Sequence, residues 1–220
     1  LKIMTNEDSR GELIDGINEI IDQGIGPEAV LIARYVPDES LEGKNLAEIS
    51  DLMRIPPAET VLSMYEKGEA MVIEYSMDEN DVDKFAKHHL IAVASDGSSV
   101  SKEGILSVGK PHPRSYGTNP RFIQKYVNEK KLVSIQEAIR KMTSMPAQRL
   151  GLTNRGRLTP GYAADIVIMD LPNVEEKATF VDPHQYPKGI THVIVNGEIV
   201  IKDEEFTGKT PGDMITDFNS

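Results

Sequence analysis

The sequence has 220 residues, of which 39% are hydrophobic and 27% are charged. This balance is typical of a chain that buries a core, and it argues against disorder. The formal net charge of −11 leaves no positive field to attract nucleic acid or an anionic membrane. The chain has no cysteine, which excludes disulfides and thiolate zinc sites and leaves His, carboxylate or a modified Lys as metal ligands.

The hydropathy of the chain and its first residues indicate the cellular compartment of the protein. No apolar stretch approaches the roughly 20 residues that a membrane helix needs, and the start of the chain lacks the basic and apolar regions of a signal peptide. We therefore expect a cytoplasmic protein. The first residue is Leu1 rather than Met, which suggests a processed, proteolysed or truncated product.

Helices and one strand are predicted for the N-terminal third of the chain. Apolar residues recur at helical spacing through residues 6–24, and a glycine closes the run. Residues 28–35 form a short apolar run that is typical of a strand. The stretch 37–68 then indicates a loop and two short helices, which Pro56 and Pro57 separate.

A strand, a helix and a second strand are expected next. Residues 69–77 form an apolar strand, and Asp78 is a suitable N-cap for a helix that turns Val82 and Phe85 inward. The apolar run that ends at residue 96 predicts the second strand. Because the connection is long enough for a crossover, we expect the two strands to be parallel neighbours in a βαβ unit.

A long loop and two helical segments follow. Residues 97–120 contain several glycines and prolines and exceed the usual connection length, and loops of this size are usually functional or disordered. Helices are expected within residues 121–131 and 134–151. In the second of these, Ser134 is the expected N-cap and Glu137 completes a capping box.

The C-terminal part of the chain has the pattern of a small β unit. Residues 156–170 and 191–208 contain short runs rich in β-branched residues. Asn196 and Gly197 lie between two apolar runs, which predicts a two-residue hairpin turn.

Six blocks of the sequence together carry a family resemblance. They read "ASDGSSVS", "KPHPRSYGTNPRFIQKYV", "SIQEAIRKMTSMPAQRLGL", "NRGRLTPGYAADIVIMD", "GITHVIVNGEIV" and "FTGKTPGDMI". These blocks resemble the D-aminoacylase group, the N-acyl-D-amino-acid deacylases of the amidohydrolase superfamily. They are similar to the C-terminal half of that group, and the segment from Glu28 to Gly68, with its "GKNLAEI" run, is similar to the group's insertion between late barrel strands.

The resemblance implies an α/β fold, namely part of a metal-dependent (β/α)8 barrel with an insertion segment and part of a small β-sandwich. Residues 1–68 would hold a barrel helix and the insertion, residues 69–150 the last βα units of the barrel, and residues 151–220 the sandwich portion. A whole barrel takes about 250 residues, so this chain cannot close one.

The resemblance also gives Asp96 a role. In this family the aspartate that ends the last barrel strand is the general acid and base, and Asp96 matches it. Amide hydrolysis by a metal-bound water needs such a group, because the water must lose a proton and the departing amine must gain one. The alternative is that Asp96 is a turn residue, since Asp-Gly is a common turn pair.

Most of the family's metal ligands are missing from this chain. The His-x-His motif, the later histidines and the bridging residue have no counterpart here, and a zinc site needs three or four protein ligands. Asp96 is a candidate metal ligand but cannot hold zinc alone. We therefore expect zinc in the intact family enzyme, no tightly bound metal in this chain, and no activity of the chain by itself.

The remaining candidate site residues are predicted to bind substrate. His112 and Arg114 lie in the loop that contains the His-Pro-Arg run of residues 112–114. The resemblance puts this loop at the mouth of the site, and the alternative is that both residues only maintain the loop's structure. Arg34, Tyr35 and Tyr75 match stretches near the family's substrate pocket, with core packing and surface charge as the alternative.

Four further histidines are given structural roles. His88 and His89 are adjacent and are expected to point apart at a helix end. His184 and His192 lie in the β tail, where surface or strand positions are expected.

The function that the resemblance implies is hydrolysis of a linear amide bond, which converts an N-acyl-D-amino acid into a D-amino acid and a carboxylate. The substrate is a small molecule, and neither nucleic acid nor a membrane is an expected partner. Exposed barrel edges favour self-association or a homo-oligomer. The alternatives are a cyclic-amide hydrolase of the same superfamily, hydantoinase-like or dihydroorotase-like, and a non-catalytic binding or scaffold protein derived from it.

Overall fold

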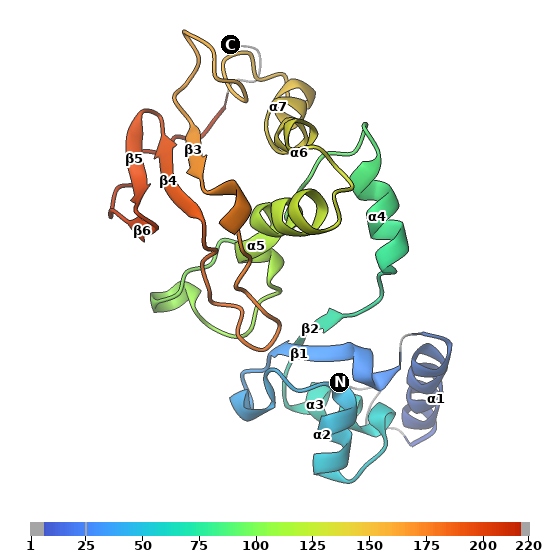
Figure 1. Cartoon of the computed structure of the whole chain (residues 1–220). Helices are drawn as coiled ribbons and strands as arrows, with labels where there is room; N and C mark the ends of the chain where they lie inside the picture. Colours follow the sequence, from blue (N-terminus) through green and yellow to red (C-terminus); the bar gives the residue numbers. More distant parts are fainter. Residues whose placement is uncertain (1–6, 25, 217–220) are drawn as a thin grey trace. The chain divides into compact units, whose positions relative to one another are not determined.

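The computed structural model describes residues 7–24 and 26–216 of this α/β chain (Figure 1). The chain divides into two compact units. The first unit consists of the described parts of Leu1–Met77, Ser99–His112 and Thr179–His184. The second consists of Asp78–Ser98, Pro113–Ala178 and the described part of Gln185–Ser220. Neither unit is one continuous stretch of sequence, and the division into 1–68, 69–150 and 151–220 stays a prediction.

The first unit has helices around a two-stranded antiparallel sheet. Its elements are α1 (Glu7–Gln23), η1 (Pro27–Ala29), β1 (Val30–Arg34), η2 (Glu39–Leu41), α2 (Leu46–Met53), α3 (Pro57–Lys67), β2 (Met71–Glu74) and η3 (Gly104–Leu106). In the sheet, Leu31 lies opposite Ile73. The predicted first helix, the strand in 28–35 and the two short helices that the proline pair separates are thereby confirmed.

Local sequence signals fix the ends of these helices. Asn45 and Glu48 form a capping box at the start of α2, since each side chain accepts a hydrogen bond from the other residue's backbone N–H at 2.8 Å. Pro57 begins α3, where its missing N–H costs nothing. Both helices pack on a small core around Ile32 and Ile49.

The second unit combines helices with a four-stranded antiparallel sheet. Its elements are α4 (Glu79–Lys87), α5 (Arg114–Arg121), η4 (Phe122–Glu129), α6 (Ile135–Met142), α7 (Ser144–Arg149), β3 (Ile166–Met169), η5 (Leu171–Asn173), β4 (Ile190–Val195), β5 (Glu198–Lys202) and β6 (Glu205–Phe206). The strands follow in the order β3-β4-β5-β6. The predicted hairpin turn is confirmed, because Asn196 and Gly197 join β4 to β5 with φ of 49° and 82°.

Helix α4 is held against η4, a π-helix, by packing and by charge. Asp78 caps α4 as predicted, by accepting from two backbone N–H groups of its first turn. Ala86 on α4 is buried with Phe122 and Tyr126 of η4. Val82 is only half-buried, and Phe85 is 53% exposed, so the predicted inward orientation of Phe85 is wrong.

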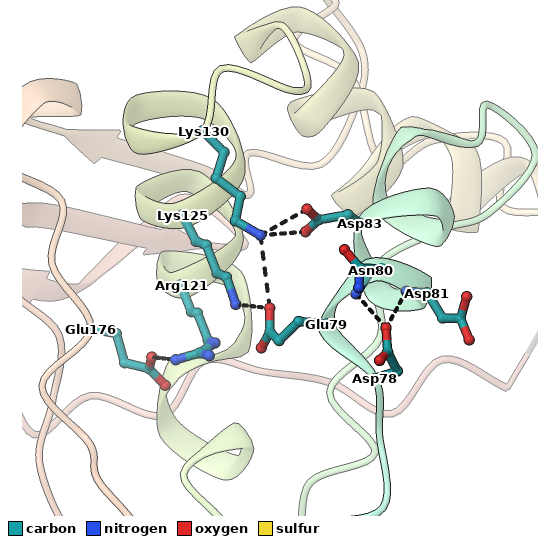
Figure 2. A network of polar contacts seen from close by, with 9 residues as sticks. All are labelled: Asp78, Glu79, Asn80, Asp81, Asp83, Arg121, Lys125, Lys130 and Glu176. Atoms are coloured by element: carbon teal, nitrogen blue, oxygen red, sulfur yellow. Dashed lines mark hydrogen bonds and ion pairs between the residues drawn. The ribbon is translucent and has the colours of Figure 1, made fainter.

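An ion-pair network joins the solvent side of the same two helices. Figure 2 shows lysines of η4 and of the residue after it reaching toward α4. Lys125 binds Glu79, and Lys130 lies 2.6 Å from Asp83 and 3.8 Å from Glu79. The hydrogen bond from Lys125 lowers the pKa of Glu79 below its ordinary value. The pair is charge-assisted, but Glu79 is largely solvent-exposed, which limits its contribution.

The predicted βαβ unit is wrong. The strand in 69–77 forms as β2, but it pairs antiparallel with β1, and residues 90–96 are not a strand. A strand needs a neighbour to take its backbone hydrogen bonds, and within the described residues this run has no ladder partner. We call residues 88–98 the Asp96 segment.

Two helical segments also differ from the prediction. Helix α5 starts at Arg114, inside the predicted loop, and runs directly into η4. The second segment is broken at Thr143 into α6 and α7. Ser134 caps α6 as expected, accepting from the N–H of Glu137 at 3.3 Å. The carboxylate of Glu137 binds Arg140, which is one turn further along the helix.

Among the described helices, none has both the length and the apolar character required to cross a membrane.

Glu79→Gln should lower the free energy of unfolding at pH 7 by at most about 1 kcal/mol, the range of exposed ion pairs. Because the pKa of Glu79 is lower in the folded state, its contribution is present above about pH 4.3 and is lost as the pH falls through the folded-state pKa. Urea unfolding between pH 7 and pH 3, followed by circular dichroism, should show the difference from wild type shrinking toward zero.

Glu205→Gln is the matched control for this measurement. Glu205 is exposed on β6 and makes no ion pair within the described part of the chain. Two results would show that the ion-pair network does not cause the loss of stability. One is an equal loss of unfolding free energy in Glu205→Gln and Glu79→Gln. The other is a difference between Glu79→Gln and wild type that stays unchanged in acid.

Candidate functional site

Asp96 presents an exposed carboxylate in the second unit. Its backbone has a positive φ of 47°, a conformation that Asp and Asn adopt more readily than most residues. The side chain is 87% exposed, and one carboxylate oxygen lies 2.9 Å from Nη2 of Arg114. Two of the predicted site residues, Asp96 and Arg114, are therefore in direct contact.

The backbone beyond Asp96 rests on the first turn of α5. The N–H of Ser98 donates to Oγ of Ser115 at 3.3 Å. A Cβ at Gly97 would lie 2.9 Å from Cα of Ser115, closer than real side chains approach backbone. Glycine therefore permits the close approach that brings Asp96 beside Arg114, which gives the Ser-Asp-Gly run a role beyond turn formation.

His112 and Tyr75 both contact the ring of Phe180 in the first unit. The ring centroids of Tyr75 and Phe180 are 4.7 Å apart, and those of His112 and Phe180 are 4.9 Å apart, both edge to face. Phe180 also packs on a small cluster that includes Ile73. Burial raises the pKa of Tyr75. The contact of residues so far apart in sequence has no signal in the sequence, which is why Phe180 was not predicted.

Tyr35 and Arg34 differ sharply in exposure. Tyr35 is 1% exposed, its hydroxyl donates to the carbonyl oxygen of Met64 at 2.8 Å, and burial raises its pKa. Arg34 ends β1 and is exposed. The geometry thus favours a structural role for the Tyr35 hydroxyl and leaves Arg34 accessible to a ligand.

The other histidines are held by local contacts. The rings of His88 and His89 are stacked, with centroids 5.1 Å apart, so the expectation that they point apart is wrong. His88 lies just past the end of α4 with extended backbone, where the alternation of a regular strand does not apply. Nε2 of His184 lies 2.9 Å from the carbonyl oxygen of Gly109, and His192 is on β4.

Within residues 7–24 and 26–216, no three His, Asp or Glu side chains lie close enough together to hold a metal ion. The described neighbour of the Asp96 carboxylate is the Arg114 guanidinium, a cation rather than a second ligand. Because zinc takes three or four protein ligands, the described residues do not by themselves fit a metal centre.

The second unit also contains a cavity. It has a volume of about 430 Å³ and is lined mainly by apolar side chains, including Ile123, Met142 and Val167. Asp96 is not among its lining residues. The candidate site is therefore defined by the exposed carboxylate and its guanidinium partner.

Comparison with known proteins finds similarity to amidohydrolases. Residues 104–201 match the amidohydrolase family. The N-acyl-D-aspartate deacylase of Alcaligenes xylosoxydans xylosoxydans is 39% identical over 146 residues, which are 66% of this chain and 28% of the relative. The D-aminoacylase of the same organism is 34% identical over 183 residues, which are 81% of this chain and 35% of the relative.

Solved structures agree with these relatives. A D-aminoacylase crystal structure matches with a TM-score of 0.72 and 35% identity over 82% of this chain and 36% of its own. The N-acyl-D-glutamate deacylase of Bordetella bronchiseptica, complexed with zinc and a phosphonate inhibitor, matches with a TM-score of 0.71 and 27% identity over 94% of this chain and 45% of its own.

The chain spans about a third of the length of these curated relatives. Their names all specify N-acylated or D-amino-acid substrates, so the alternative of a cyclic-amide hydrolase is not favoured.

Tyr35→Phe should lower the free energy of unfolding by about 1 kcal/mol, because it removes a buried hydrogen bond. Tyr75 lies in the same unit and is 41% exposed, so Tyr75→Phe should change the free energy of unfolding by no more than about 0.5 kcal/mol. Urea unfolding of both variants makes the comparison. Equal stability of wild type and Tyr35→Phe would contradict the structural role.

Proposed function

We propose that this chain belongs to the amidohydrolase family and forms the C-terminal portion of an N-acyl-D-amino-acid deacylase. The reaction is hydrolysis of the linear amide bond of an N-acyl-D-amino acid, which gives a D-amino acid and a carboxylate. The names of the matched relatives support the bond type and the D configuration, and they differ in the amino acid. Because the chain spans about a third of their length, the activity requires the rest of such a polypeptide.

Asp96 is the proposed general acid and base. The observation that carries this role is its exposed carboxylate, which the Arg114 guanidinium holds at 2.9 Å. Amide hydrolysis removes a proton from the attacking water and delivers one to the departing amine, and one carboxylate can do both in turn. A charge-assisted contact limits the positions the carboxylate takes, which matters because proton transfer needs hydrogen-bond distance to the reacting atoms.

Substrate recognition is assigned to the charged and aromatic candidates. The α-carboxylate of a D-amino acid requires a cation, and Arg114 or the exposed Arg34 can supply a bidentate contact. Tyr75 and His112, which both contact Phe180, offer aromatic surface for the acyl group or side chain. Tyr35, whose buried hydroxyl binds the backbone of Met64, is proposed to act on substrate binding indirectly, by supporting the end of β1.

The finer features of the enzyme are also proposals. Zinc would be held mainly by residues outside the described part of the chain, with Asp96 as a candidate ligand, since the described residues do not form its site by themselves. The complete catalytic domain would be a (β/α)8 barrel in a cytoplasmic enzyme. Self-association is proposed through β3, which is an edge strand with two half-exposed apolar side chains, Val167 and Ile168.

Asp96→Asn in a polypeptide of the relatives' full length should lower kcat for N-acyl-D-amino acids by about 100-fold or more, since it removes the group that transfers protons. Asp203→Asn is the matched control, because Asp203 also combines a positive φ, 53°, with a side chain that is 77% exposed. Steady-state kinetics should show near-normal kcat for the control. Equal kcat for wild type and Asp96→Asn would eliminate Asp96 as the proton carrier.

The 220-residue chain alone should bind zinc weakly and leave N-acyl-D-amino acids intact, because its described residues do not assemble a ligand set. Isothermal titration with zinc and an assay for released D-amino acid measure the two properties. Stoichiometric tight zinc binding together with hydrolysis by this chain would refute the proposal.

A further inference from the structure

Lys141, in the last turn of α6, is a buried cation that forms no ion pair with a carboxylate in the described part of the chain. Its side chain is 1% exposed. Its ammonium group donates to the carbonyl oxygen of His88 and, at 2.8 Å, to that of Ile91. No ion pair joins it to Asp or Glu within the described residues, and burial lowers its pKa.

Such a group is costly unless it has a structural or functional purpose. Lysine is almost never fully buried unless it is paired, because the ammonium loses its hydration. A methionine of similar length would pack there without that loss. The carbonyl oxygens that Lys141 binds therefore indicate what it does, which is to hold the backbone of residues 88–91 against α6.

Further contacts from α6 act on the same stretch. The N–H of Val93 donates to the backbone oxygen of Lys141 at 3.2 Å. Nη2 of Arg140 donates to the carbonyl oxygen of His89 at 2.5 Å. These contacts replace the strand ladder that this stretch lacks, and they fix the first half of the Asp96 segment.

The second half of the segment is fixed by α5. Arg114 binds the Asp96 carboxylate, and Ser115 binds the N–H of Ser98. Only Ala94 and Ser95 lie between the part that α6 holds and Asp96. The position of the carboxylate thus depends on anchors at both ends of the segment.

We propose that Lys141 is a positioning residue. Its ammonium group binds the carbonyl oxygens of His88 and Ile91, which holds this backbone against α6 and thereby determines the position of the Asp96 carboxylate. The effect on catalysis rests on the proposed deacylase function. The effect on the backbone of the Asp96 segment does not, so the two are tested separately.

The structural effect is tested on the 220-residue chain by amide hydrogen exchange, resolved by NMR. Lys141→Met keeps the length and removes the ammonium. The amide of Val93 should then exchange about tenfold faster or more, as expected when charged hydrogen bonds are lost. Amides of the sheet, such as Val193 on β4, should keep their wild-type rates. Lys141→Gln, which can still donate to one carbonyl oxygen, should give an intermediate rate.

Chemical rescue separates the ammonium from the packing of the side chain. The sequence has no cysteine, so Lys141→Cys can be modified at that position alone. Reaction of the unfolded variant with 2-bromoethylamine, followed by refolding, restores an ammonium on a chain of lysine's length. This product should regain the slow exchange of Val93, whereas the unmodified variant should not. Lys84→Met, at a 75% exposed lysine of α4, is the control and should exchange like wild type.

Three results would overturn the proposal. They are a wild-type exchange rate at Val93 in Lys141→Met, a uniform acceleration that includes the β4 amides, and a failure of aminoethylation to restore the rate. The second result would mean that Lys141 supports the whole unit rather than this segment.

The catalytic effect is tested in a polypeptide of full length with an N-acetyl-D-amino acid as substrate. Lys141→Met should lower kcat about tenfold with little change in KM, because the substrate contacts remain while the carboxylate is misplaced. An unchanged kcat, or a loss confined to KM, would contradict positioning. A wild-type enzyme without deacylase activity would refute the proposed function and leave the exchange result standing.

Discussion

The backbone that carries Asp96 has no strand partner within the described residues, so side-chain contacts must hold it in place. Ladder hydrogen bonds usually fix an apolar run of this kind, and here α6 supplies Lys141 and Arg140 while α5 supplies Arg114. Each of these cations binds a carbonyl or carboxylate oxygen of the segment. The geometry of the candidate site thus depends on how α5 and α6 are themselves held.

Packing within the second unit holds α5 and α6 in place. Helix α5 continues into η4, whose aromatic face shares a core with α4 and α6. The ion-pair network of Figure 2 adds charge-assisted contacts between η4 and α4 at the surface. Glu176, almost fully buried, reaches Arg121 at the end of α5 and lies so near Gly117 that a larger residue there would collide with it. Core burial therefore supports the helices, and the helices position the carboxylate.

Local signals predicted much of this fold. Asp78 caps α4 and Asn196-Gly197 makes the hairpin, because a cap or a tight turn is decided by a few neighbouring residues. The run that ends at Asp96 was predicted as a strand on its apolar pattern, which says nothing about whether a partner strand is present. The roles of Phe180 and Lys141 could not be predicted from the sequence, because they depend on contacts between distant parts of the chain. The resemblance identified Asp96, whereas its ion pair with Arg114 is a feature of the structure.

The most direct measurement is a crystal structure of a full-length polypeptide that contains this chain, bound to a phosphonate mimic of an N-acyl-D-amino acid. The account predicts that the Asp96 carboxylate lies within hydrogen-bond distance of the phosphonate or of the nitrogen position beside it, with Lys141 still bound to the backbone of the segment. A phosphonate bound far from Asp96, with that carboxylate facing open solvent, would contradict it.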